Sequence, residues 1–93
     1  MLVRNHILCP YSDCEANKRS GDLRIQVIVN EVNDNRTVSL RKTLKGEKEN
    51  TSLPYNYKRE VYNEKCPYCQ RPVEVVIDET HSTRYIHLRQ RKN

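Results

Sequence analysis

The sequence has no tryptophan and no phenylalanine, so its only aromatic residues other than histidine are six tyrosines. Hydrophobic residues make up 35% of the 93 positions, against roughly 45–50% in an average soluble domain. Because large apolar side chains are scarce, the core must be small and built from Val, Ile, Leu and Cys. A short chain of this polarity often needs a disulfide, a bound metal or a partner to hold its fold.

Other absences exclude several classes of protein. No apolar run approaches the ~20 residues of a membrane span. The opening stretch MLVRNHILCP carries Arg4 and His6 within its apolar residues, which is a poor signal peptide. The two glycines, Gly21 and Gly46, are too far apart for a phosphate-binding loop. Because a signal peptide and a membrane span are not indicated, we expect a cytoplasmic protein. Because no catalytic arrangement of side chains is recognisable, we expect that it is not an enzyme.

The formal net charge of +5 is distributed unevenly. Residues 84–93 contain four basic residues and no acidic one, whereas residues 1–83 contain 13 basic and 12 acidic residues. This pattern favours a basic C-terminal tail, residues 89–93, that contacts an anionic partner. A solvated, solubilising terminus explains the same charges.

Alternating apolar and polar residues indicate β-strands rather than helices. Residues 23–29 and 37–44 alternate on either side of Asn33-Asp34-Asn35, which predicts a hairpin with a turn at those residues. Residues 73–78 and 84–88 predict a second hairpin, and shorter strands are expected at 2–8 and 59–65. Residues 45–58 have no periodicity and predict a long exposed loop. The predicted fold class is therefore mainly β, a single domain over residues 1–93.

Four cysteines occur as two close pairs. Four residues separate Cys9 from Cys14, two separate Cys66 from Cys69, and 51 lie between the pairs. In a reducing compartment this spacing points to metal rather than disulfides. Closely spaced cysteines on tight turns suit zinc, which takes four ligands in a tetrahedron. A disulfide scaffold or incidental pairs are the alternatives, and His6, His81 or His87 could replace one cysteine.

The sequences CPYSDC (9–14) and CPYCQRP (66–72), each followed by strand-like residues, resemble the zinc ribbon family. The resemblance implies antiparallel hairpins around one structural zinc per chain, bound by Cys9, Cys14, Cys66 and Cys69. Zinc ribbons commonly have Gly after the second cysteine of each pair, whereas this chain has Glu15 and Gln70.

Cys66-Pro67-Tyr68-Cys69 also matches the active-site motif of glutaredoxins. That chemistry needs the first thiol at the N-terminal end of a helix, which lowers the thiol pKa. Here Pro72 and the alternating residues after it predict a strand instead. A rubredoxin-like iron electron carrier stays as an alternative, because four thiolates also bind iron.

Exposed tyrosines and cations suggest what such a module binds. Tyrosines stack on bases while cations contact phosphates. The hypothesis is a small regulatory factor in transcription or DNA processing that binds nucleic acid, as a monomer or homodimer. The alternative is a protein–protein interaction adaptor in such a complex. The candidate nucleic-acid contacts are Tyr55, Tyr57, Lys58, Arg59, Arg84, Tyr85, Arg89, Arg91 and Lys92.

Overall fold

The computed structural model describes residues 2–46, 50–51, 56–80 and 83–91. Over these residues the chain forms strands and one short 3-10 turn, which confirms the mainly β fold class. In chain order the elements are β1 (Leu2–Ile7), η1 (Glu15–Asn17), β2 (Leu23–Val32), β3 (Asn35–Leu44), β4 (Asn50–Thr51), β5 (Arg59–Lys65), β6 (Pro72–Asp78) and β7 (Tyr85–Gln90). Among the described residues, no helical segment reaches the length and apolarity that crossing a membrane requires.

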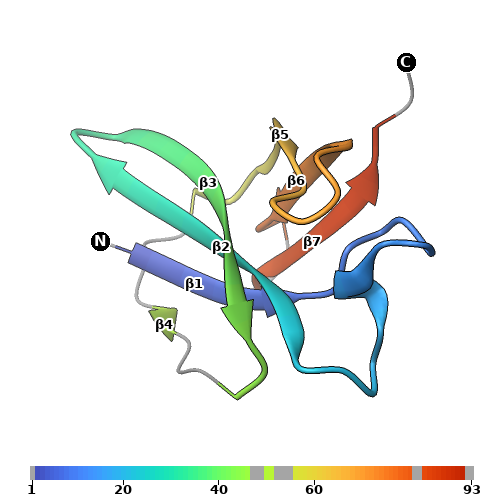
Figure 1. Cartoon of the computed structure of the whole chain (residues 1–93). Coiled ribbons are helices and arrows are strands. Elements are labelled where there is room, and N and C mark those ends of the chain that lie inside the picture. Colours follow the sequence, from blue (N-terminus) through green and yellow to red (C-terminus); the bar gives the residue numbers. More distant parts are fainter. Residues whose placement is uncertain (1, 47–49, 52–55, 81–82, 92–93) are drawn as a thin grey trace.

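The strands form two antiparallel sheets (Figure 1). The first has the order β3-β2-β1-β4, and the second has the order β5-β6-β7. The predicted first hairpin is β2–β3, with Val32 paired to Asn35 across the turn. Asn33 and Asp34 have φ values of 52° and 65°. Asn and Asp tolerate this left-handed backbone better than most residues, which is why a two-residue turn forms here.

Each cysteine pair lies in the connection between two paired strands. The first connection joins β1 to β2, and the second joins β5 to β6. A third strand then follows in each half, β3 in the first sheet and β7 in the second, and β4 adds a fourth strand to the first sheet. The short strands expected before each cysteine pair are thus β1 and β5. The two halves of the chain repeat one plan of strand, cysteine pair, strand and strand.

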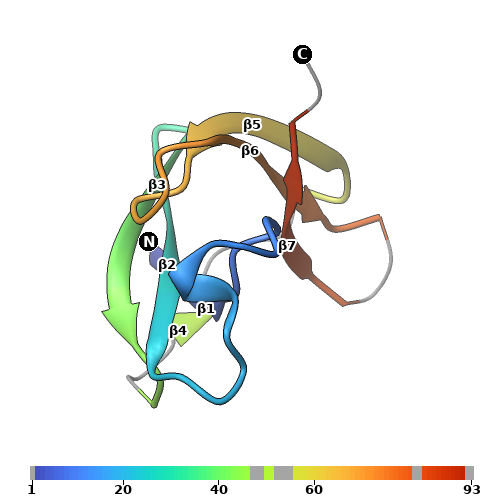
Figure 2. The ribbon, with the colours of Figure 1, turned by 45° about the vertical axis from the view of Figure 1, so that its right-hand side comes forward.

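The core lies between the two sheets. Val27 and Val29 of β2 pack with Val75 and Ile77 of β6, and all four are fully buried. Burying each such side chain contributes about 1.5–3 kcal/mol. The sheets also approach each other where β5 lies near β3 and where β7 lies near β1 (Figure 2).

The predicted loop and tail are only partly within the described residues. Of the loop expected at 45–58, residues 47–49 and 52–55 lie outside them. Asn50 and Thr51 form β4, which pairs with β1 and adds an edge to the first sheet. β7 extends to Gln90, so the first two residues of the expected tail belong to the second sheet.

Candidate metal centre

The four cysteines converge although 51 residues separate their pairs. Their Sγ atoms all lie within 4.8 Å of one another. The distance is 3.9 Å between Cys9 and Cys69 and 3.7 Å between Cys14 and Cys66. Four sulfurs placed about 2.3 Å from a tetrahedral ion would be about 3.8 Å apart. A disulfide needs about 2.05 Å, and all four thiols are free. The arrangement therefore fits one ion held by four thiolates.

Hydrogen bonds within the first cysteine turn fix the positions of its sulfurs. The backbone N–H of Cys14 donates to the carbonyl of Tyr11 at 3.1 Å, and that of Cys9 donates to Ala16 at 3.3 Å. The backbone N–H groups of Tyr11 and Ala16 donate to the sulfurs of Cys9 and Cys14, respectively. Glu15 lies in η1, so the chain leaves this turn through a 3-10 turn.

The second cysteine turn reverses more sharply. Cys66 donates its N–H to the Arg71 carbonyl at 3.0 Å, and its own carbonyl accepts from Gln70 at 2.9 Å. Gln70 has φ of 63°, the left-handed conformation for which glycine is favoured. This is the position at which zinc ribbons commonly have Gly. Gln70 thus adopts the left-handed backbone conformation that a glycine would adopt at this position.

The surroundings of the thiols set their pKa values. Burial raises the pKa of the Cys9 and Cys14 thiols above the usual value. Cys69 is the least buried of the four. Burial also acts to raise its pKa, but the Arg71 N–H and the neighbouring thiols outweigh burial and lower it. A cation at the centre would stabilise all four thiolates, because metal ligation deprotonates thiols.

Two tyrosines brace the centre by joining one half of the chain to the other. Tyr11 of the first cysteine turn donates its hydroxyl to the carbonyl of Pro72 in β6 at 2.6 Å. Tyr68 of the second turn lies 2.9 Å from the Arg24 carbonyl and 3.0 Å from that of Thr43. The tyrosine of the Cys-Pro-Tyr sequence in each cysteine turn thus forms hydrogen bonds with the other half of the chain.

An exposed ion pair adds a further link between the cysteine turns. The Arg71 guanidinium donates to both carboxylate oxygens of Asp13, and it lies 5.0 Å from the centre of the Tyr11 ring. The hydrogen bond from Arg71 holds the pKa of Asp13 below its usual value. Sequence reasoning missed this link, since a single Asp and a single Arg 58 residues apart give no periodic signal.

The two histidines within the described residues, His6 and His87, are not part of the thiol cluster. Among the described residues, the cluster that could hold an ion contains the four cysteines alone. His6 lies beside Gln26, with 3.3 Å between their Nε2 atoms. His87 is exposed on β7, and His81 is outside the described residues.

The candidate nucleic-acid residues are divided between surface and interior. Tyr57, Lys58 and Arg59 are exposed at the start of β5, and Tyr85 is exposed at the start of β7. Arg84 has a side chain only 7% exposed and bonds Glu79 at 2.8 Å. The positions of Arg89 and Arg91 are exposed, while Tyr55 and Lys92 lie outside the described residues.

A buried ionic network that the sequence did not reveal links the two sheets. Glu79 is fully buried, and its carboxylate accepts from Arg36 of β3 at 2.7 Å as well as from Arg84. Arg36 also bonds Glu60 of β5 at 2.9 Å, and the Tyr62 hydroxyl donates to Glu60 at 2.6 Å. Burial raises the pKa of Tyr62, and the neighbouring Glu60 carboxylate raises it further.

Comparison with protein-family models, curated proteins and solved structures finds no match to this chain.

Proposed function

We propose that the chain is a non-catalytic module in which one zinc ion, bound by four cysteines, stabilises a surface that binds nucleic acid. Zinc is favoured because a closed set of four tetrahedral thiolates is typical of structural zinc. Such a centre leaves no ligand position open for a substrate.

Free thiols of this kind suit a reducing, cytoplasmic compartment. A regulatory role in transcription or DNA processing fits a small module of this type. Iron is the competing metal, and its thiolate centre would be red rather than colourless.

The proposed interface is the outward face of the second sheet. Val73, Val75 and Ile77 of β6 point into the core, so Glu74, Val76 and Asp78 point to the opposite face. Val76 is fully buried there, whereas Glu74 and Asp78 are partly exposed. The strand register places Arg59 and Tyr85 in one row on this face, on either side of Asp78. The basic residues that follow this alternation outward are Arg59, Lys65, Arg89 and Arg91.

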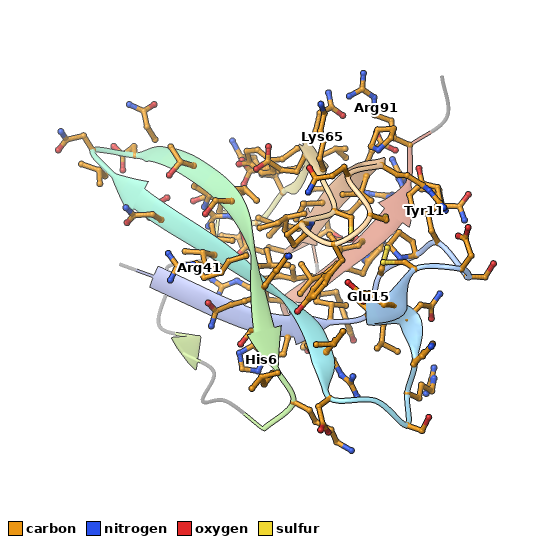
Figure 3. All side chains as sticks on the ribbon, viewed as in Figure 1. His6, Tyr11, Glu15, Arg41, Lys65 and Arg91 are labelled. Carbon is orange, nitrogen blue, oxygen red and sulfur yellow. The ribbon has the colours of Figure 1, made fainter. Side chains whose placement is uncertain are left out.

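The observation that carries the proposal is the meeting of Lys65 and Arg91 at one end of this face. Together with Asn63 and Glu64 they line a depression of about 420 Å³, and the two cations project from the same end of the molecule (Figure 3). Within the described part of the chain, no carboxylate forms an ion pair with Lys65 or Arg91. The two cations and the Asn63 amide suit a phosphate group, and they outnumber the one carboxylate that lines the depression, that of Glu64. Lys65 was missed at the sequence level because it adjoins a cysteine rather than a tyrosine or the tail.

The acids on this face are partly occupied by other contacts. Glu74 accepts from Arg89 at 2.8 Å. Asp78 accepts from the N–H and the hydroxyl of Thr80 at 3.1 Å and 2.6 Å. The four outward cations also outnumber the two outward acids, Glu74 and Asp78. This excess gives the face a positive charge, which attracts phosphates.

A salt titration tests the proposal. The zinc-loaded full chain is expected to bind nucleic acid at ~50 mM salt and to weaken steeply as salt rises. Each lost phosphate contact lowers the slope of log affinity against log salt by about 1. A variant carrying Arg59→Ala, Lys65→Ala and Arg91→Ala should thus lose about 2–3 units of slope.

Arg41→Ala is the matched control, since Arg41 is exposed on β3 of the other sheet. It removes one of the same kind of charge, against three in the interface variant, without touching the proposed interface. Equal slopes for the triple variant and Arg41→Ala would contradict the proposed interface. No binding to DNA or RNA at ~50 mM salt would contradict the function itself.

A protein-interaction adaptor is the second candidate. Leu23, Leu44 and Tyr68 help to line a depression of about 480 Å³ beside the metal centre. Leu44 is 52% exposed there, and exposed apolar groups in a hollow suit a protein partner. Absence of nucleic-acid binding by the zinc-loaded chain would favour this function.

A further inference from the structure

β7 carries an ordered row of chemically distinct side chains. Ile86 and Leu88 pack against the core, so the residues that alternate with them point outward. In chain order the outward row is Tyr85, His87, Arg89 and Arg91, which is two rings followed by two cations. Successive members are about 7 Å apart, because a strand rises about 3.4 Å per residue.

The two rings are accessible. Tyr85 is 54% exposed, and His87 is also exposed. His87 lies across from Val76, which in turn pairs with Val61 of β5, a residue 44% exposed. The two rings of the row thus lie near the apolar Val61. At the other end of the row, Arg91 lines the depression together with Lys65.

This order favours unpaired bases over a duplex. Aromatic rings stack on bases whose faces are accessible, as they are in single strands, whereas a duplex hides those faces. The major groove is about 12 Å wide and admits a helix or a two-stranded ribbon. A three-stranded sheet already measures about 10 Å between its outer strands before side chains are added.

We propose that single-stranded nucleic acid lies along the outward side of β7, with bases stacked on Tyr85 and His87 and phosphates held by Arg91 and Lys65. This inference rests on the proposed nucleic-acid function and narrows it to one substrate class. The row spans about 20 Å from Tyr85 to Arg91, which suits a short binding site of a few nucleotides.

The test measures binding of the zinc-loaded full chain to a labelled 12-nucleotide single strand and to a 12-base-pair duplex. The single strand should bind more tightly. Tyr85→Ala and His87→Ala should each lower single-strand affinity by about 5- to 150-fold, the usual effect of removing one stacking ring. Tyr85→Phe and His87→Tyr keep a ring and should retain most of the affinity.

Val32→Ala is the control, because Val32 is exposed on the first sheet and 59% accessible. Equal metal content in every variant shows that the fold is intact. Salt-dependent binding that does not distinguish single strand from duplex, and that survives both alanine variants, would overturn this inference and leave the proposed function standing. Failure of both nucleic acids to bind would overturn the two together.

Discussion

Gln70 occupies a backbone conformation that most side chains avoid. Left-handed φ costs a non-glycine residue about 1–2 kcal/mol, and a β-branched side chain suffers most. Gln70 already bears this cost, so Gln70→Val is expected to lower the free energy of unfolding of the metal-bound protein by only the additional strain of a β-branched side chain, about 1 kcal/mol. Gln70→Gly should be neutral or stabilising, since its extra freedom when unfolded costs only about 0.5–1 kcal/mol. Denaturant titration measures both.

The equivalent position in the first cysteine turn supplies the control. Glu15 lies in a 3-10 turn and has no positive φ. Glu15→Val should thus cost less than Gln70→Val. Equal losses at the two positions would show that the left-handed backbone of Gln70 is not the cause.

Glu79 is the residue on which the buried ionic network depends. Glu79→Gln keeps the shape of the side chain but removes the buried negative charge that Arg36 and Arg84 share, which should cost about 3–5 kcal/mol at pH 7. Burial acts to raise the pKa of Glu79, but hydrogen bonds from Arg36, Arg84 and the Asn56 N–H outweigh it and lower the pKa below 4.5.

The pH dependence of this loss has a definite sign. A carboxyl whose pKa is lowered on folding stabilises the protein at pH values above its unfolded pKa, and the contribution disappears as pH falls through the folded pKa. The gap in unfolding free energy between wild type and Glu79→Gln should be full at pH 7 and shrink below about pH 4.5. Urea titrations across that range measure the gap, and a constant gap would contradict the ionic account.

At the scale of elements, the alternation of apolar and polar residues predicted the strands and the hairpins. The β2–β3 hairpin follows from period-2 residues on either side of Asn33 and Asp34, and the convergence of the cysteines follows from their paired spacing. Alternation cannot show which face meets another sheet. The inward position of Arg84, the pairing of β4 with β1 and the division into two sheets depend on tertiary contacts, so they appear only in the structure.

The two tyrosine braces make the cysteine turns depend on each other's half of the chain. Tyr11→Phe removes one hydrogen bond to Pro72, and Tyr68→Phe removes the bond to the β2–β3 hairpin. Each should cost about 1 kcal/mol and speed the loss of metal to a chelator. Tyr85→Phe is the control, because Tyr85 is exposed. Unchanged release rates in both brace variants would show that these contacts do not support the centre.

For the whole molecule, the cysteines are part of the core as well as metal ligands. Cys9, Cys14 and Cys66 pack with Ile25 and Val73 in one buried cluster. Binding of a structural zinc contributes about 10–16 kcal/mol in small domains, which a core of this size cannot replace. Chelation should therefore unfold both sheets together, with loss of the β signal in circular dichroism.

Cys66→Ser should reproduce the effect of the chelator, because it removes one of four ligands. Ser39→Ala, at an exposed position on β3, should leave the metal and the fold unchanged. A chain that keeps its circular dichroism and melting temperature after chelation would not depend on a metal.

The most direct test of the zinc centre is elemental analysis of the freshly purified chain, with Cys66→Ser measured beside it. The account predicts one zinc per wild-type chain, absence of colour, and loss of that zinc in the variant. A folded wild-type chain without bound metal would contradict it, and one iron per chain would contradict the assignment of zinc.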